Sequence, residues 1–365
     1  MGKFKLPENL KISLPSFARQ HKLALGLDIG SYSVKVCEII PTSANGHQVI
    51  KTGSAKLPDG AVEDGVLQNP EAVAAIIDTL CKNLRIKQKK VAISMSGYSV
   101  IVKKINLAVM EDKELAEHIK SEAEQYIPFD INDVYLDYQD LKTNTENSEF
   151  TDIMLVAAKK DVINAYLEML TGIGLQTVVV DVDAFALENS FEDQISGGQN
   201  FILIDIGASK ISINIIAHGA SILARDVVMG SRQITEQIQE KLGIEAEEAE
   251  NLKIGGKKAE EEEKKAVEEI VVNNCSQWIL EIKKAIDFYA SNYPEDKISR
   301  IILSGGGSKI KGLDKFLNKE LNMETEIFNP FAKTEVSDKI DRDYLAHIAP
   351  EMAIAAGLAL RPVTL

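Results

Sequence analysis

Two segments of the chain carry the same alternation of apolar and polar positions around a short turn. Residues 27–36 (LDIGSYSVKV) recur 177 positions later as residues 204–213 (IDIGASKISI). Each copy predicts an apolar strand that ends in an Asp, a glycine turn, and a second strand with period-two alternation. Because a repeat reproduces both residues and context, it predicts a duplicated α/β fold whose two lobes face a cleft.

Hydrophobic spacing predicts the elements that follow the first hairpin. Strands are expected over 49–56, 90–95, 134–141, 152–158 and 177–182, with helices over 70–84, 112–127 and 162–170. Asn69-Pro70-Glu71 favours the first of these helices, since it offers a capping side chain, a proline at the first position and an early acid. The block over 96–175 interrupts the first lobe (23–95 and 176–198) and is predicted to be an inserted α+β subdomain.

The second lobe is predicted to span residues 199–365. Helices are expected over 231–242 and 245–253, and an apolar stripe at spacing three and four from Val271 to Tyr289 predicts a long helix. These helices form a predicted helical subdomain over about 230–295. A buried strand over 301–303, a helix from Leu313, a strand over 325–328 and a return helix over 344–360 complete the lobe.

Composition restricts the possible partners. The 365 residues carry a net charge of -14, which disfavours nucleic-acid binding because phosphate neutralisation needs a basic surface. The three cysteines are far apart and are expected to be reduced thiols. We expect neither a signal peptide nor a membrane span.

Residues 1–22 depart from this acidic composition, with five Lys or Arg residues and one Glu among scattered apolar residues. A flexible or loosely docked lead-in is favoured over a membrane-surface helix, because Pro7 and Pro15 would interrupt a helix.

The two hairpins offer the groups that a nucleoside triphosphate needs. Backbone amides of a glycine turn form an anion-receptive concavity, so the predicted phosphate-binding residues are Gly30, Ser31, Ser33, Lys35, Gly207, Ala208 and Ser209. Lys35 can return along the second strand to the phosphate. Asp28 and Asp205 end their strands at the cleft, where the two carboxylates are predicted to hold Mg²⁺ through water.

A third element, Ser304 to Lys309, follows a buried strand. Gly305, Gly306 and Gly307 allow a flat or phosphorylated ligand to approach the backbone, with Lys309 beside them; the alternative is a flexible loop. Glu250 and Lys253 share a helical face and are predicted to reach a ribose or purine, although a surface salt bridge is almost as plausible. No GxxxxGK[ST] and no strand-to-helix GxGxxG occurs, so a P-loop and a dinucleotide fold are both disfavoured.

With both hairpins and the glycine-rich strand end in order, the chain resembles the actin/Hsp70/sugar-kinase superfamily, a duplicated RNase H-like fold. Residues 28–35 and 204–213 are similar to its two phosphate motifs, and 301–309 to its adenosine motif. Residues 183–187 and 349–360 resemble its two connecting helices, whose small residues would let them cross closely.

Within that superfamily the chain resembles the type IV pilus assembly protein PilM family. The similar motifs are residues 26–35, 124–129 (EQYIPF), 181–187 (DVDAFAL), 287–289 (DFY) and 350–360. The resemblance implies a cytoplasmic, actin-like ATP-binding protein that is peripheral on the inner membrane. Its insertion would be an SHS2-like (1C) subdomain that takes the place of actin's subdomain 1B, as in the cell-division protein FtsA.

The family resemblance also implies partners. A PilN-type membrane protein would dock its short cytoplasmic N-terminal segment in a groove between the first subdomain and the insertion, so membrane contact is indirect. Tyr126, Ile127 and Phe129 are predicted to line that groove, with subdomain core as an equally weighted alternative. Cytoplasmic motor components are further expected partners, and a homo-oligomer is possible.

Two departures from the superfamily pattern favour slow chemistry. The second phosphate loop has one glycine where Hsp70-like chaperones have several, and Asp183 stands where fast ATPases carry Gln or Glu. Asp183 and Asp205 are the candidate catalytic residues, and a side chain one methylene shorter misplaces the attacking water. We therefore expect ATP binding with slow hydrolysis at most. The alternatives are an FtsA-like filament-forming ATPase or a small-molecule kinase.

Overall fold

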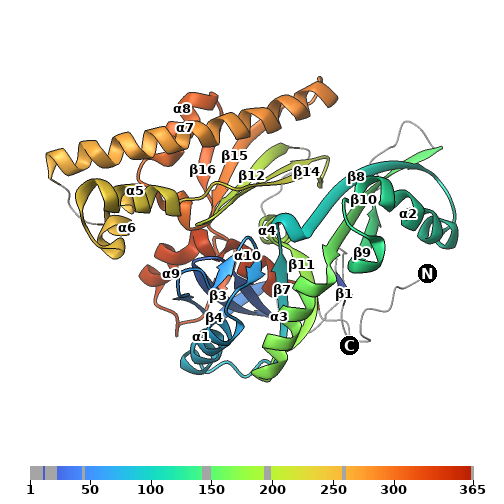
Figure 1. Cartoon of the computed structure of the whole chain (residues 1–365), viewed down its shortest axis with the longest axis horizontal. Helices are drawn as coiled ribbons and strands as arrows, with labels where there is room; N and C mark the ends of the chain where they lie inside the picture. The colour runs from blue at the N-terminus through green and yellow to red at the C-terminus, as the bar shows by residue number, and fades with distance from the viewer. Residues whose placement is uncertain are drawn as a thin grey trace. The chain divides into compact units, whose positions relative to one another are not determined.

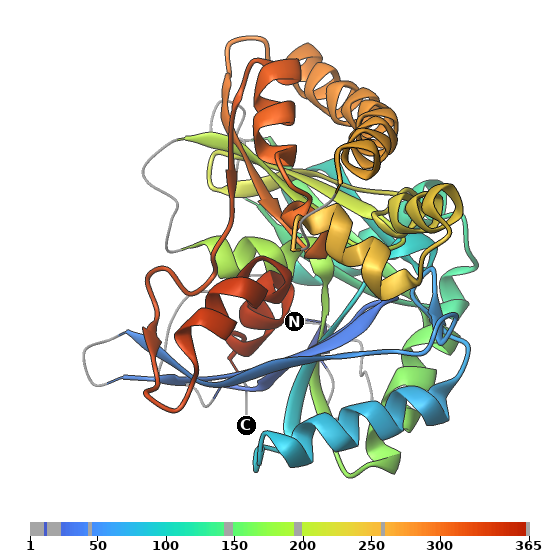
Figure 2. The same cartoon turned by 90° about the vertical axis from the view of Figure 1, so that its left-hand side faces the viewer.

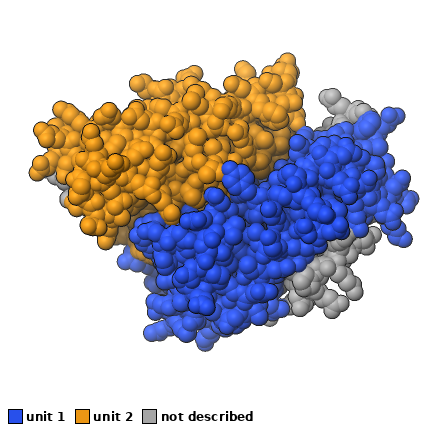
Figure 3. All heavy atoms as spheres, viewed as in Figure 1, with its two compact units in different colours: residues 1–194, 331–342, 354–365 blue, residues 195–330, 343–353 orange. Residues whose placement is uncertain are grey.

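The computed structural model describes residues 11–12, 23–42, 46–141, 149–192, 199–256 and 260–362. The chain divides into two compact units, coloured separately in Figure 3. Unit 1 comprises residues 1–194, 331–342 and 354–365, and unit 2 comprises residues 195–330 and 343–353. Each unit contains one of the two repeated hairpins.

A mixed sheet forms the centre of unit 1. Its strand order is β1 (Lys11–Ile12), β11 (Gln176–Val182), β7 (Lys90–Met95), β2 (Leu25–Ile29), β3 (Ser33–Pro41), β4 (His47–Lys56) and β17 (Glu335–Val336). The strands from β1 to β2 run parallel, whereas β3 is antiparallel to both of its neighbours. The hairpin β2–β3 therefore lies in the middle of the sheet.

Two helices cover one face of this sheet. Helix α1 (Pro70–Asn83) begins where the Asn69 side chain accepts a hydrogen bond from the Ala72 amide (3.1 Å), as the sequence predicts. The apolar sides of α1 and α3 (Lys160–Gly172) pack with Leu25 and Leu27 in one core. Figure 2 shows α1 lying along the strands.

Glycines position the helices on the other face. A Cβ at Gly26 of β2 would lie 2.0 Å from the Ala355 carbonyl oxygen of α10 (Ala353–Ala359). A Cβ at Gly357 would lie 1.7 Å from the Ala186 oxygen of α4 (Asp183–Phe191), and the Asn189 amide donates to the Gly357 carbonyl (2.6 Å). The predicted close crossing of the two connecting helices is therefore confirmed.

The insertion has a sheet of its own, β8 (Val100–Ala108), β10 (Phe150–Lys159) and β9 (Val134–Asp140), all antiparallel. Helix α2 (Asp112–Tyr126) lies beside this sheet, as Figure 1 shows. Its apolar side chains complete a separate core with those of the three strands. One part of the expected insertion belongs elsewhere: the buried side of α3, including Ile163 and Tyr166, packs in the main core of unit 1. The change of core therefore comes after β10 and not at residue 175.

Unit 2 is built on a five-stranded sheet in the order β14 (Ala220–Val227), β13 (Ile211–Ala217), β12 (Asn200–Ile206), β15 (Ile298–Ser304) and β16 (Glu324–Ile327). Helices α5 (Arg232–Leu242), α6 (Ala246–Ile254), α7 (Glu261–Asn292) and α8 (Leu313–Leu321) accompany it. The predicted apolar stripe is confirmed as the buried side of α7, where Cys275, Trp278 and Ile282 pack with the sheet.

The predicted return helix over 344–360 is in fact three pieces: α9 (Arg342–Ile348), a 3₁₀ turn η5 (Ala349–Met352) and α10. Pro350 explains the interruption, because proline has no amide hydrogen for a helical bond. The Pro350 carbonyl accepts a hydrogen bond from the Gly305 amide (2.8 Å), so this turn is held against the end of β15. The remaining short elements are β5 (Val62–Glu63), β6 (Val66–Leu67), η1 (Gly97–Ser99), η2 (Ile131–Asp133) and η4 (Gly306–Lys309).

Candidate functional site

The first predicted phosphate loop is a tight hairpin turn between β2 and β3. Asp28 and Lys35 are directly paired across the hairpin, and their carboxylate and ammonium lie 3.1 Å apart. The turn closes where the Gly30 amide donates to the Ser33 carbonyl (3.1 Å). A Cβ at Gly30 would lie 3.1 Å from the Lys35 nitrogen. The lysine thus returns over the glycine turn, as the spacing predicts.

This loop brings a cation and a carboxylate together. Asp28 is 7% exposed and Lys35 keeps only part of its side chain in solvent, so their charges are poorly screened. A phosphate oxygen arriving over Gly30 would meet the Lys35 ammonium, while Asp28 would face the cation that accompanies the phosphate. Ser31 follows in the turn, and Ser33 is buried at the start of β3.

The second predicted loop is held by the start of α5. The Gly207 amide donates to the Lys210 carbonyl (2.9 Å), which closes the turn between β12 and β13. The Gly207 and Ala208 carbonyls accept from the amides of Ser231 (3.0 Å) and Arg232 (2.9 Å). Because a Cβ at Gly230 would lie 2.0 Å from the Ala208 oxygen, glycine there allows this close approach.

Asp205, at the end of β12, is oriented by Ser304, the first residue of the glycine-rich element, for which the sequence predicted no such role. The Ser304 hydroxyl donates to its carboxylate (2.9 Å), and the two residues are paired in the parallel register of β12 and β15. The strand ends of the second predicted phosphate loop and of the glycine-rich motif are thus joined at the carboxyl ends of two neighbouring strands of the unit 2 sheet.

The three glycines after β15 serve different purposes. Gly305 has φ +81°, and a Cβ there would lie 2.5 Å from the Ile206 oxygen. A Cβ at Gly307 would lie 2.3 Å from the Ile206 side chain. At Gly306, by contrast, the nearest atom is a carboxylate oxygen of Glu351, 3.7 Å away. Packing inside unit 2 therefore explains Gly305 and Gly307 but leaves space at Gly306.

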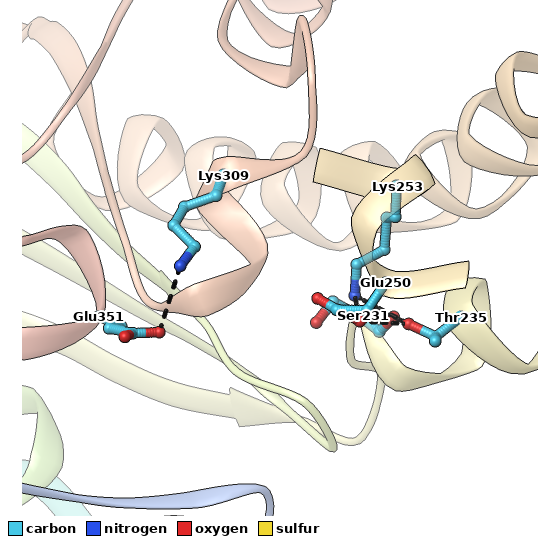
Figure 4. Close-up of polar contacts among 6 residues, drawn as sticks. All are labelled: Ser231, Thr235, Glu250, Lys253, Lys309 and Glu351. Atoms are coloured by element: carbon cyan, nitrogen blue, oxygen red, sulfur yellow. Dashed lines mark hydrogen bonds and ion pairs between the residues drawn. The ribbon is translucent and has the colours of Figure 1, made fainter. Parts of the chain in front are cut away.

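Glu250 and Lys253 of α6 lie together with the start of α5 (Figure 4). The Lys253 ammonium donates to the Glu250 carboxylate (2.7 Å), the Thr235 hydroxyl (2.9 Å) and the Ser231 carbonyl (3.2 Å). The Thr235 hydroxyl donates in turn to Glu250 (2.7 Å). The ion pair is therefore real but not at the surface, because the Lys253 side chain is only 2% exposed.

Lys309 points toward a different acid in Figure 4, Glu351 of η5, at 3.5 Å. Burial lowers the pKa of Lys253, and the positive charge of Lys309 lowers it further, whereas Glu250 opposes both. A negatively charged ligand beside Lys309 would relieve this repulsion between the two ammonium groups. Glu351 was missed from the sequence because it lies 42 residues beyond Lys309.

Asp183 opens helix α4 directly after β11. A buried group of charges lies beside it: Arg361 donates through Nε to Asp181, and both side chains are almost completely buried. Burial raises the pKa of Glu188 to about 8, although Arg361 opposes the rise. Nothing in the local sequence pattern predicts this group, which links the end of α10 to α4 and β11.

The three residues predicted to line a partner groove have different environments. Ile127 is 5% exposed and belongs to the core of the insertion, so for this residue the alternative interpretation as subdomain core holds and the groove wall does not. Phe129 packs against that core and carries the Lys159 ammonium 4.5 Å from its ring centroid. Tyr126 is exposed at the end of α2, with Lys103 5.7 Å from its ring centroid.

Across the part of the chain that the structure describes, no group of three or more His, Cys, Asp or Glu side chains forms a metal cluster. No helix among the same residues is long and apolar enough to cross a membrane.

The family described as "Type IV pilus assembly protein PilM" matches residues 26–363. The chain belongs to the PilM family. A solved PilM-PilN type IV pilus biogenesis complex contains a chain that is 29% identical, and the match covers 95% of this chain and 100% of that chain with a TM-score of 0.82.

More distant solved structures show how widely the fold of this PilM family member is shared. The ethanolamine utilization protein EutJ from Carboxydothermus hydrogenoformans is 14% identical with a TM-score of 0.56, over 95% of this chain and 92% of that chain. MreB5 of Spiroplasma citri, solved with AMPPNP, is 11% identical with a TM-score of 0.52, and the match covers 92% of this chain and 94% of that chain. The chain is thus an actin-like protein of type IV pilus assembly with a duplicated α/β fold.

Proposed function

We propose that this PilM family member binds ATP with Mg²⁺ and uses the nucleotide mainly as a structural ligand. Three features support the proposal: a lysine that returns over the glycine turn of the first loop, a second loop closed by α5, and the open position at Gly306. MreB5, which shares the fold, was solved with a nucleotide analogue.

The residues present fit such a ligand. Gly30, Ser31, Ser33 and Lys35 would hold phosphates on one loop, and Gly207, Ala208 and Ser209 on the other. Asp28 and Asp205 are the carboxylates suited to a hydrated Mg²⁺, which would neutralise phosphate charge. On the adenosine side we now favour Gly306, Lys309 and Glu351, because Lys253 is already saturated by partners inside unit 2.

We further propose that the chain binds the short N-terminal segment of a PilN-type inner-membrane protein and links it to the cytoplasmic pilus motor. The observation that carries this proposal is the match of 29% identity over the whole of the PilM-PilN complex chain. Such binding would place the protein at the cytoplasmic face of the inner membrane. Tyr126 and Phe129 are the aromatic residues that we assign to the peptide surface.

Isothermal titration of the full chain with the partner's N-terminal peptide, with and without Mg·ATP, tests both proposals when ATP binding is titrated and phosphate release is assayed on the same protein. We expect saturable peptide binding that Tyr126→Ala weakens and that Tyr344→Ala, an exposed tyrosine of unit 2, leaves unchanged. Asp28→Asn should abolish ATP binding, and Asp59→Asn at an exposed turn should not. Rapid phosphate release without peptide binding would overturn the scaffold proposal in favour of a kinase or a filament ATPase.

A further inference from the structure

The outer edge of the unit 1 sheet is occupied by the chain's own N-terminal region. Lys11 and Ile12 form β1, which pairs in parallel with β11 at Val179 and Val180. β11 has β7 as its other neighbour, so β1 completes the sheet on this side. The remainder of residues 1–22 lies outside the described residues. The extended pairing of Lys11–Ile12 is that of a docked lead-in and not of a membrane-surface helix at these two positions.

Among the described residues, β1 covers only part of this edge. β11 has seven residues, and β1 pairs with two of them. A strand edge presents backbone N–H and C=O groups that can pair with any extended segment of suitable direction. Addition of a peptide strand to such an edge is a common mode of peptide recognition, in which the main chain supplies affinity and alternate side chains supply specificity.

The segment between β1 and β2 is long enough for β1 to reach the β11 edge of its own chain. β1 and β2 run parallel, with β11 and β7 between them. Parallel strands need a crossover of about a dozen residues, and residues 13–24 lie between Ile12 and Leu25. Three strand spacings amount to about 14 Å, whereas this crossover can reach about 40 Å when extended.

The sequence around β1 is suited to this role. Leu10, Ile12 and Leu14 alternate in the sequence with polar or basic residues, and this period-two pattern is compatible with a strand. Residues 1–22 carry five basic side chains and one acid, whereas the whole chain has a net charge of -14. A segment of this composition is therefore attracted to the acidic remainder of the chain by charge as well as by the backbone pairing of β1.

We propose that the outer edge of β11 is a docking site for an extended segment that runs parallel to it, and that Lys11–Ile12 fills this site in cis. A segment tethered to its own site acts at high effective concentration, so it competes with a segment offered in trans. The trans occupant that we assign is the partner's N-terminal segment; this identity rests on the proposed function, whereas the cis pairing does not.

Hydrogen exchange on the full chain tests the cis pairing alone. Lys11→Pro/Ile12→Pro removes both amides of β1 and disfavours its place in a sheet. We expect amides within residues 176–182 to exchange about tenfold faster or more in this variant. The matched control, Lys3→Pro/Phe4→Pro, places the same substitutions in the same tail outside β1 and should leave exchange unchanged. Equal protection in all three proteins would overturn the proposal.

Peptide titration tests the competition. The partner's N-terminal peptide should bind the Lys11→Pro/Ile12→Pro variant with a Kd at least about fivefold lower than its Kd for the wild type or for the control. A synthetic peptide of residues 8–19 should also bind this variant in trans and compete with the partner's peptide. Equal affinity of the partner's peptide for all three proteins would overturn the competition.

Two further outcomes separate this proposal from others. If the partner's peptide binds no form but the 8–19 peptide still binds the proline variant, the cis pairing stands and the proposed function fails. If light scattering shows a wild-type dimer that the proline variant dissolves, a second copy fills the edge and the cis proposal is wrong.

Discussion

At Gly306, the absence of a side chain has no explanation in the packing of unit 2, whereas its neighbour Gly305 combines a positive φ with close contact to Ile206. We therefore predict that Gly306→Ala keeps the thermal midpoint within about 2 °C of wild type but weakens ATP binding by about tenfold or more, because a methyl group occupies the space for the ligand. Thermal unfolding and ATP titration on the same sample measure both effects.

Gly305→Ala supplies the matched comparison for this prediction. A Cβ at that position is strained by φ +81° and would lie 2.5 Å from the Ile206 oxygen, so we expect a loss of about 3 kcal/mol of unfolding free energy. If Gly306→Ala destabilises the protein as much as Gly305→Ala and leaves ATP affinity intact, Gly306 serves the fold and not the ligand.

The Glu188 carboxyl predicts how stability depends on pH. Burial raises its pKa from 4.5 to about 8, so between these values the folded state binds more protons than the unfolded state. Stability from this group is therefore fully present below pH 4.5 and is lost as pH rises to 8, by about 5 kcal/mol at most. We expect Glu188→Gln to remove this loss, which urea unfolding at pH 5 and at pH 8.5 would measure.

Other buried acids make the comparison with the variant essential. Burial also raises the pKa of Asp137 to about 6, which adds a loss of the same sign between pH 3.8 and 6. This contribution is common to wild type and Glu188→Gln, so the difference between the two proteins isolates Glu188. Equal pH dependence in both proteins would mean that the carboxyl is ionised in the fold.

Single residues also mark the limit of prediction from sequence. The return of Lys35 over Gly30 was predictable because a hairpin fixes which residues are opposite each other. The burial of Lys253 was not, since its partners Ser231 and Thr235 come from the preceding helix region. Ile127 and Tyr126 are adjacent in the sequence, yet one is core and the other exposed, because helix α2 ends between them.

At the scale of elements, the crossing of α4 and α10 depends on one glycine. A Cβ at Gly357 would lie 1.7 Å from the Ala186 oxygen, and backbone atoms cannot move aside as a flexible side chain can. We predict that Gly357→Ala lowers the free energy of unfolding by about 3 kcal/mol or more. Denaturant unfolding followed by circular dichroism measures this loss.

Gly172, the last residue of α3, is the control for that substitution. Nothing lies within 4 Å of its Cβ position, so Gly172→Ala should be neutral or slightly stabilising. A similar loss of stability in the two variants would show that the crossing is looser than its geometry indicates.

Elements with a clear hydrophobic period were predictable, and their packing partners were less so. The sequence predicted a helix in the region of α3, because its apolar side has the right spacing, but not that this side packs on the main sheet. β1 has two residues, and the short alternation around them in the sequence was not recognised as a strand. The prediction of one continuous helix over 344–360 overlooked the break at Pro350. Proline is tolerated at the start of a helix, and Pro350 lies at the start of the 3₁₀ turn η5.

At the scale of the whole molecule, the proposed nucleotide is a ligand of the native state. Such a ligand raises stability by RT ln(1 + [L]/Kd), or about 2.7 kcal/mol at a concentration of 100 Kd. We predict that Mg·ATP and a non-hydrolysable analogue raise the thermal midpoint equally, because binding and not hydrolysis supplies the stabilisation. Asp28→Asn should lose this rise, and Asp59→Asn should keep it.

Slow turnover is the second half of the same prediction. Asp183 is shorter than the Gln or Glu that would orient an attacking water, and it lies close enough to the buried carboxylate of Asp181 to raise the pKa of that group. We expect phosphate release at least ~100-fold below the ~1 s⁻¹ that marks the low end of ordinary enzymes. Midpoints that fall during incubation with ATP but not with the analogue would contradict this expectation, because the ligand would then be consumed within the experiment. If the thermal midpoint of the protein stays unchanged over hours with ATP, the nucleotide acts as a structural ligand that remains bound while the partner's segment binds and dissociates.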